Sequence, residues 1–570
     1  MSKAGFSCAA EARRQGAAFG GAYAWAMSAM LIPALSTLAL AHEDNAIPSV
    51  ESCETSTYLD LARPADMQAP YNSETGFSDL MASNLGQTVL KHLWVNSDAS
   101  APCFAISDTP FWGPRLSRIP ADVLGVEVSK DRDHALVYSS GIPDFTVETP
   151  TLFTGFKPGN IYGVYKLHAE PQEDTRTEHD FVVGGAIGYF LNGSSIFNYT
   201  DTFSYENKGT WLYNANVAEA TVVNSDYSHA TPGDIEGFVQ SRGIFHNHQM
   251  SVKVLAQLAD PFLLGAMAHS RLVGFAIDSY PIYGPIGYAS TDKSSKLKVL
   301  KSSYVKRDWL KSGTGGSGHR SALPGWAVQG WNGTYSGETL RNFFEKNKAD
   351  MLFADGASEG PVQYSGDDEK MATEIAFLSG EVDLLRDAQG YVYYENTVTT
   401  PAGDDVVTRN YLLKSSDLWG PDVDQVILPA TYQVADQDKF SFPAAVGSFA
   451  EDYEYVAGYG DLDFYNGIES YVPELDRALY HYVTPYDASI HDRDRLTKAQ
   501  FPYFIGIEYR GAVDPFNEST FSETDKAAYL TENRGNYEAV IDLGIVGKDE
   551  SGTVQEAPVI ETWRTTLAGD

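Results

Sequence analysis

Short apolar runs separated by Gly, Pro, Asn and Asp fill two stretches of the chain, at about 90–310 and 447–510. Runs of this length between turn-forming residues are typical of β-strands. Between the two stretches, residues 338–353 and 371–390 space their apolar side chains as helices do, and Gly390 is well placed to end the second helix. The pattern predicts a mainly β protein with a sandwich- or barrel-like domain and a partly helical insertion.

A weak internal repeat lies in the first β stretch. The segment GYFLNGSSIF (188–197) resembles GFAIDSYPIY (274–283), and both read as two strands joined by a turn. Asn192-Gly193 is a strong hairpin signal because both residues tolerate the positive φ that a tight turn requires. The repeat predicts two related hairpins within one β domain.

The N-terminus has the pattern of an export signal. Lys3, Arg13 and Arg14 precede an apolar run over 21–41, which ends in the tripeptide ALA at 39–41. Signal peptidase recognises this combination of a basic start, an apolar stretch and small residues, so we expect cleavage after residue 41 and a secreted or periplasmic protein. An uncleaved transmembrane anchor is the alternative.

These signals divide the chain into consecutive parts, and a Gly/Ser-rich stretch at 310–326 marks the change from strand to helix patterns. The expected parts are a signal peptide at 1–41, an N-terminal lead-in at 42–90, the first part of the β domain at 91–325, an insertion subdomain with helices at 326–446, the returning part of the β domain at 447–510, and an acidic C-terminal extension at 511–570.

Charge and cysteine content narrow the classes of partner. The formal net charge is −35, so nucleic acid and anionic membranes are poor partners, and no membrane contact is expected after signal cleavage. Of three cysteines, Cys8 lies in the signal, and Cys53 and Cys103 predict one disulfide in an oxidising compartment. The sequence has neither a phosphate-binding loop nor a dinucleotide fingerprint before a helix, so no nucleotide cofactor is expected.

Two histidines stand one residue apart in IFHNHQM (244–250), in a chain with 12 His among 570 residues. Alternate side chains of a strand share a face, so His246, His248 and Met250 are predicted to point the same way. Two adjacent imidazoles form a chelate for zinc or copper, and a nearby thioether favours copper slightly. The pattern predicts a divalent transition-metal site; the alternative is an ordinary pair of hydrogen-bonded histidines.

Three further residues could complete such a site. His229 precedes the pair, whereas His269 and Asp278 follow it. Asp278 could instead form a turn before Ser-Tyr-Pro, and His269 could be a histidine at the end of a strand or helix. The candidate metal ligands are therefore His246, His248, His229, His269 and Asp278, and no catalytic residue is assigned.

Several segments resemble the YHYH domain family, whose members are secreted or periplasmic. They are GYFLNGSSIFNYTD (188–201), DYSHATPG (226–233), IFHNH (244–248), AHSRLVGFAIDSYPIYGPIGY (268–288) and EDYEYVAGYGDLDFYNG (451–467). Here the name-giving tetrapeptide reads Phe-His-Asn-His, and Ser279 stands where the family has Gly. The resemblance implies a metal-binding or catalytic role for His246 and His248, but it carries no general activity.

Three functions remain open from the sequence. The first is a secreted metal-dependent enzyme, a hydrolase or an oxidoreductase, in which the metal activates water or cycles electrons. The second is a module that captures or delivers a metal without turnover. The third is a metal-free structural or surface protein. An open coordination position would favour the enzyme and a closed one the binding module; neither substrate nor protein partner is predicted.

Overall fold

The computed structural model describes somewhat more than half of the chain. The described residues are 77–94, 103–107, 115–118, 122–139, 141, 143, 145, 147–148, 163–176, 179–180, 182, 185–230, 244–307, 318–329, 382–388, 391–413, 419–428, 441–518, 521–542, 547–548 and 554–555. The signal peptide predicted at 1–41 and Cys53 lie outside these ranges, so signal cleavage and the Cys53–Cys103 disulfide stay predictions.

Two units can be distinguished by their internal contacts. One consists of Met1–Ala46 and Lys548–Thr553, and the other of Ile47–Gly547 and Val554–Asp570. All sites discussed below belong to the second unit. Among the residues that the structure describes, no helix combines the length and apolar character needed to cross a bilayer.

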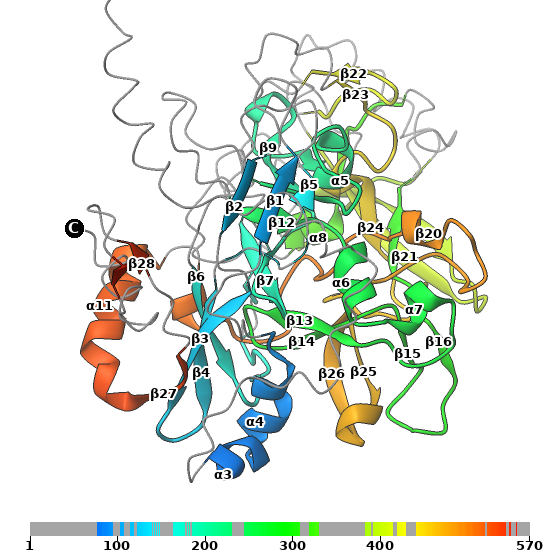
Figure 1. Cartoon of the computed structure of the whole chain (residues 1–570). Helices are drawn as coiled ribbons and strands as arrows, with labels where there is room; N and C mark the ends of the chain where they lie inside the picture. The colour runs from blue at the N-terminus through cyan, green and yellow to red at the C-terminus, as the bar shows by residue number, and fades with distance from the viewer. Residues whose placement is uncertain are drawn as a thin grey trace, which may run out of the picture. The chain divides into compact units, whose positions relative to one another are not determined.

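An eight-stranded sheet forms the centre of the second unit (Figure 1). Its strands, in spatial order, are β11 (Ser228–Ala230), β12 (Phe245–Asn247), β8 (Ser195–Phe197), β7 (Ala186–Phe190), β13 (Leu272–Ala276), β14 (Pro281–Tyr283), β26 (Arg477–Val483) and β25 (Gly467–Val472). None of the described sheets closes on itself. The mainly β class is therefore confirmed, and the described strands form no closed barrel.

The internal repeat forms the middle of this sheet. Strands β7 and β8 make one antiparallel hairpin, β13 and β14 make the other, and β7 pairs antiparallel with β13. Gly193 in the first turn has φ +77° and Ser279 in the second has φ +71°, so corresponding positions adopt the left-handed conformation. The two related hairpins are confirmed as neighbours in one sheet.

Glycine is required where the two hairpins meet. A Cβ added at Gly274 would lie 2.2 Å from the carbonyl oxygen of Tyr189 and 2.9 Å from the Cα of Phe190. Neither backbone atom can move away without separating β7 from β13. We expect Gly274→Ala to lower the free energy of unfolding by about 1–3 kcal/mol, the usual cost of overpacking a core, as measured by chemical denaturation.

Gly163 provides the matched control, because it also lies in a strand but an added Cβ there meets nothing within 4 Å. Gly163→Ala should leave stability unchanged or raise it by about 0.4–1 kcal/mol, through the smaller entropy of the unfolded chain. Equal effects of the two substitutions would contradict the close approach of β7 and β13.

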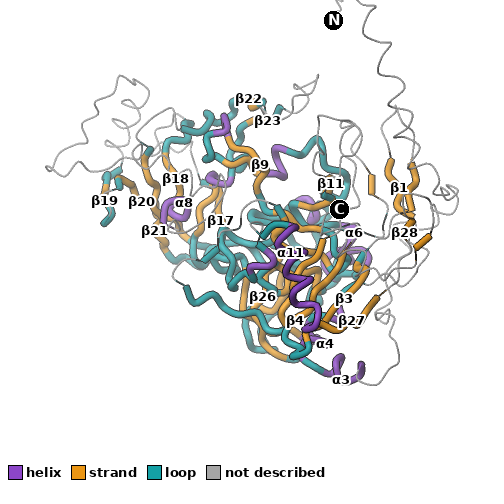
Figure 2. Tube along the Cα trace, turned by 90° about the vertical axis from the view of Figure 1, so that its left-hand side faces the viewer, coloured by secondary structure: helices purple, strands orange, loops and turns teal. Residues whose placement is uncertain are grey.

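A four-stranded sheet packs between the central sheet and the C-terminal helix. It has the order β27 (Tyr537–Asp542), β3 (Val123–Ser129), β4 (His134–Ser139) and β6 (Gly163–His168). Side chains of β4 alternate: Ala135 and Val137 join the main core, whereas Leu136 and Tyr138 face a smaller cluster with residues around α11 (Glu523–Asn533). In two perpendicular views α11 lies alongside this sheet (Figures 1 and 2).

The contact between the two sheets gives the fold a local sandwich-like character. Tyr165 of β6 stacks on Tyr189 of β7, with ring centroids 3.9 Å apart. The predicted N-terminal lead-in contributes α3 (Phe77–Ala82) and α4 (Asn84–Thr88), and the Trp94 amide donates to the Leu191 carbonyl. The predicted C-terminal extension contributes β27, so parts of both flanking regions belong to the packed unit.

The described parts of the predicted insertion are mostly strands. β21 (Asp405–Leu412), β20 (Val392–Thr399) and β19 (Leu385–Arg386) pair in that order, and β18 (Ala322–Pro324), which precedes the predicted insertion, joins this sheet beside β21, with α8 (Gly325–Gln329) next to it. Residues 382–388 are not helical, in contrast to the helix expected over 371–390. Val382 and Leu384, two residues apart, both pack against the core, and Leu385 pairs with Tyr393, as residues of a strand do. The helix expected over 338–353 lies outside the described residues.

A buried ion pair anchors this region to the returning part of the β domain. The Arg320 guanidinium donates to both carboxylate oxygens of Asp452, at 2.7 and 2.9 Å, and to the carbonyls of Pro421 and Ala444. Both charged side chains are fully buried. Their mutual contact therefore fixes the chain around 320 against the chain around 452.

The remaining elements are short. They are β1 (Cys103–Ser107), β2 (Arg115–Arg118), β5 (Val147–Glu148), β9 (Thr200–Ser204), β10 (Leu212–Asn214), α5 (Ala215–Ala218), α6 (Val252–Gln257), α7 (Pro261–Leu264), β15 (Ile286–Tyr288), β16 (Leu297–Val299), β17 (Tyr304–Lys306), β22 (Val426–Ile427), β23 (Phe442–Pro443), β24 (Tyr453–Tyr455), β28 (Gly547–Lys548) and β29 (Val554–Gln555).

Candidate metal centre

The predicted histidines meet at one end of the central sheet. Strand β12 runs antiparallel to β11 and parallel to β8, and His246 lies directly opposite His229 in the β11–β12 register. The side-chain amide of Asn247 donates from Nδ2 to the carbonyls of Asp226 and Tyr227, at 2.8 and 3.2 Å. These bonds connect β12 with the turn that precedes β11. Cross-strand neighbours lie close enough for their side chains to share a ligand.

Backbone carbonyls fix the orientation of two of the rings. Nδ1 of His246 donates to the carbonyl of Ile244 at 2.8 Å, and Nδ1 of His248 donates to the carbonyl of Asn198 at 2.6 Å. A carbonyl only accepts, so both Nδ1 atoms carry the proton and a neutral ring has its lone pair on Nε2. The two Nε2 atoms face each other 3.1 Å apart.

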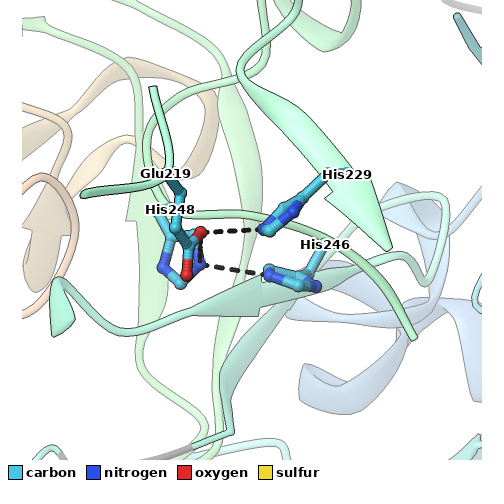
Figure 3. Close-up of side chains that lie close together, drawn as sticks. All are labelled: Glu219, His229, His246 and His248. Carbon is cyan, nitrogen blue, oxygen red and sulfur yellow. Dashed lines mark hydrogen bonds and ion pairs between the residues drawn. The ribbon is translucent and has the colours of Figure 1, made fainter. Parts of the chain in front are cut away.

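Glu219 lies beside the three histidine rings as a fourth possible ligand, and it was not predicted from the sequence. It follows α5, its amide donates to the Ala215 carbonyl at 2.8 Å, and this last turn directs the carboxylate toward the rings. Its Oε2 lies 2.9 Å from Nε2 of His229 and 3.1 Å from Nε2 of His248. Figure 3 shows the three rings and the carboxylate pointing toward one another.

All four side chains are buried, and their charges are coupled. Burial opposes ionisation of Glu219, but His248 and His229 outweigh it and hold the pKa of the carboxyl well below its usual range. Burial, with the neighbouring His229 and His248, holds the pKa of His246 well below its ordinary value. Burial also acts to lower the pKa of His248, but the Glu219 carboxylate reverses this effect and raises it. The group therefore combines a charged carboxylate with a neutral His246.

The spacing of the donor atoms suits a small metal ion. Donors placed tetrahedrally at about 2.0–2.1 Å from a metal lie about 3.3–3.4 Å from one another. The ligand atoms of Glu219, His229, His246 and His248 all lie within 4.8 Å of one another, and three of these pairs are 2.9–3.1 Å apart. An expansion of a few tenths of an ångström in those contacts would accommodate the ion.

Aromatic packing holds the His246 ring in this position. Phe197 of β8 stacks on it with ring centroids 3.8 Å apart and an interplanar angle of 15°. Phe197 also contacts the His248 ring edge-to-face at 5.9 Å. The phenyl ring therefore forms an apolar wall beside the donors, and such a wall strengthens electrostatic contacts inside the group.

Comparison with models of known protein families shows which family the chain belongs to. A family model described as YHYH protein matches residues 164–356 and 388–494, which make up more than half of the sequence. The chain belongs to the YHYH family. No curated protein and no solved structure gives a match.

The YHYH match includes all four residues of the metal centre. It is interrupted over 357–387 and otherwise continues through both ends of the insertion that we predicted at 326–446. The insertion at 326–446 itself stays a prediction.

His269, predicted as a possible ligand, lies in a different part of this YHYH protein. Its Nδ1 donates to the Ser270 carbonyl at 2.8 Å, and its ring contacts Tyr283, Tyr288 and His481. It does not belong to the group around Glu219. His269 lies just before β13, and β13 is separated from β12 by β8 and β7 in the sheet.

Asp278, the other possible ligand, has a structural role in the second hairpin turn. Its Oδ1 accepts the Tyr280 amide at 3.2 Å, which is the turn-forming bond considered as the alternative. Its Oδ2 accepts the Tyr482 hydroxyl at 2.6 Å and the Gly511 amide at 2.9 Å. These bonds connect the turn with β26 and with the segment after it, away from the metal centre. Met250 is buried in the main core.

Proposed function

We propose that this YHYH protein binds one divalent d-block cation through His229, His246, His248 and Glu219. The observation that carries the proposal is the pair of Nε2 lone pairs, 3.1 Å apart, beside a charged carboxylate. Two lone pairs and an anion repel one another unless a cation lies among them. The group therefore needs a positive charge, supplied by a metal ion or by a proton on His248.

Three imidazoles favour a metal ion over a proton. A single proton on His248 can bond to Glu219 or to His246, whereas a metal ion accepts one donor atom from each of the four side chains. The carbonyls that hold His246 and His248 are also the outer partners that commonly orient metal-bound histidines. The donor set thus suits a metal more completely than it suits a proton.

The carboxylate shifts our choice of metal from copper toward zinc. The preference for copper depended on the sulfur of Met250, whereas the fourth donor of the described group is an oxygen of Glu219. Three imidazoles and one carboxylate form a donor set that zinc accepts readily in tetrahedral geometry. We therefore propose zinc first and copper second.

The burial of the site supports metal binding without turnover. The exposed fractions are 5% for Glu219, 4% for His229, 2% for His246 and 3% for His248. Four protein donors fill a tetrahedral ion, and catalytic zinc sites keep one position for water or substrate. We infer a closed site that binds or captures a metal without turnover. A metal-dependent enzyme is the second candidate. Export from the cytoplasm is also part of the proposal, and it rests on the sequence alone.

Metal content provides the test. Protein purified from its own host without added metal should contain about one zinc per chain after dialysis against a weak chelator. Glu219→Gln preserves the size of the side chain but removes its charge, and we expect metal affinity to fall at least about tenfold, because even residues behind the ligands contribute about 10–100-fold. Elemental analysis and zinc competition titrations measure both quantities.

His269→Gln is the control. It removes an imidazole that also lies within the YHYH match but does not belong to the group around Glu219. It should retain the full metal content. Wild-type protein without metal that also fails to take up zinc or copper would contradict the proposal, and so would equal losses in the two variants.

A further inference from the structure

A second group of metal-binding side chains lies on the four-stranded sheet. His134 begins β4, His168 ends β6, and the two residues are direct partners in the antiparallel register. Asp133 precedes β4, and ligand atoms of all three side chains lie within 4.8 Å of one another. The side chains are 14%, 27% and 60% exposed for His134, His168 and Asp133, so this group is open to solvent in a way that the Glu219 group is not.

The rings of His134 and His168 both direct their Nδ1 atom toward one carboxylate oxygen of Asp133. Nδ1 of His134 lies 3.3 Å from Oδ2 of Asp133, and Nδ1 of His168 lies 3.2 Å from the same atom. Adjacent donors on an ion with bonds of about 2.0–2.2 Å lie about 3.0–3.5 Å apart. These distances are the edges that three donors on a common ion would have.

The far side of each ring supports this orientation. Nε2 of His168 lies 2.9 Å from Oδ2 of Asp514, which Lys166 also contacts at 2.9 Å. A carboxylate only accepts, so His168 carries a proton on Nε2, and its neutral form has a lone pair on Nδ1 directed at Asp133. A carboxylate behind a histidine is the usual outer partner of a metal-bound imidazole. Nε2 of His134 lies 2.8 Å from the Tyr537 hydroxyl, which can accept its proton in the same way.

The backbone holds Asp133 in place without a metal. Its amide donates to Oγ of Ser129 at 3.1 Å, and its carbonyl accepts the Ala169 amide at 2.8 Å. The hairpin loop between β3 and β4 is thereby fixed against the end of β6. The carboxylate is positioned opposite the rings before any ion binds, so little ordering of the chain opposes binding.

We propose that Asp133, His134 and His168 form a second site for a divalent cation such as Zn²⁺. Two imidazoles and one carboxylate supply three donors, and the exposure of the group leaves the remaining positions to water. A site with three protein donors exchanges its ion more readily than a buried site with four. The competing arrangement is a doubly protonated His168 that bridges Asp133 and Asp514.

This site is independent of the Glu219 centre and of the function proposed for it. Asp133 and His134 precede the YHYH match, and Asp514 and Tyr537 follow it. His168 lies within the match, so the second site would join one residue of the family domain to residues that flank it. Binding there would also strengthen the contact between β6 and the C-terminal region.

Calorimetric titration with Zn²⁺ of the full-length protein, stripped of bound metal with a strong chelator, tests the proposal. Asp133→Asn removes the charged donor but keeps the size of an exposed side chain, so we expect it to fold normally. We expect the wild type to show two binding events, one at each site. The event at the second site should weaken at least about tenfold in this variant and in His168→Gln. Glu219→Gln should instead weaken the other event, so failure of the two proposals can be told apart.

Asp131→Asn is the matched control, because Asp131 is an exposed aspartate in the same loop and its substitution changes the charge equally. It should bind as the wild type does. The proposal is overturned if Asp133→Asn retains both binding events unchanged, or if Asp131→Asn weakens the same event to the same extent, since the second result would indicate attraction to an acidic surface alone.

Discussion

Replacing both His246 and His248 with Ala is expected to remove the metal-dependent stability that arises at the Glu219 centre. An ion that binds only the native state stabilises it by RT ln(1 + [L]/Kd), about 2.7 kcal/mol when the free metal is at 100 Kd. The wild type should gain this amount between chelator and excess zinc, and the double variant should gain nothing at the Glu219 centre. Calorimetric unfolding of both proteins under both conditions measures the difference.

The double variant should also lose stability in chelator. Truncation leaves the carbonyls of Ile244 and Asn198 without their imidazole donors and removes the ring that stacks on Phe197. Buried groups left unsatisfied cost about 1–3 kcal/mol each. The informative quantity is therefore the shift that metal causes in each protein, and a wild type with no such shift would identify the two histidines as an ordinary structural pair.

His481→Ala is the control for that experiment. His481 is fully buried and its Nδ1 donates to the Leu479 carbonyl at 3.0 Å, so it resembles His246 in burial and in bonding. It lies on β26, at the other end of the central sheet from β12. Its loss should reduce stability to a similar extent in chelator and leave the metal-induced shift intact.

Arg320→Leu is expected to cause the largest loss of stability, about 3–5 kcal/mol. The substitution would leave the Asp452 carboxylate buried without its cation, and an uncompensated buried charge costs this amount. It would also remove the bonds from the guanidinium to the Pro421 and Ala444 carbonyls. The midpoint of chemical denaturation, with the slope of the transition, gives the change.

Arg409→Leu provides the comparison at the surface. Arg409 pairs with Glu395 at 3.6 Å, and the two side chains are 42% and 36% exposed. Exposed pairs contribute about 0–1 kcal/mol because water screens them. If Arg320→Leu cost no more than Arg409→Leu, the buried pair could not be the anchor between the chain around 320 and the chain around 452.

Local patterns were sufficient to predict the parts of the fold that depend on neighbours in sequence. Asn192-Gly193 forms its own turn. His246 and His248 do lie side by side, as the spacing in 244–250 predicted, but β12 ends at Asn247, so His248 is not part of the expected strand. The pairing of β27 with β3 could not be predicted, because the two strands lie about 400 residues apart in sequence and each has other possible partners. Similarly, the end of the helix expected over 371–390 became β19 because a neighbouring strand supplied hydrogen bonds.

The proposed metal ligands show the same limit. His229 was predicted from its closeness to the pair in sequence, and the β11–β12 register places it opposite His246. Glu219 carried no comparable signal, since it is one of 76 acidic residues and no spacing distinguishes it. His269 and Asp278 also follow the pair closely in sequence, but they lie at the two ends of β13, which β8 and β7 separate from β12. Closeness along the chain is therefore a weak guide to which side chains share an ion.

The position of the proposed metal centre also bears on how the central sheet would open. β11 is the outermost described strand at one end of that sheet, it is three residues long, and its Ser228 and His229 are buried. His229 contacts Glu219 and lies opposite His246, so an ion at this point would join β11 both to β12 and to the end of α5. Depletion of metal would therefore weaken the sheet first at this outermost strand.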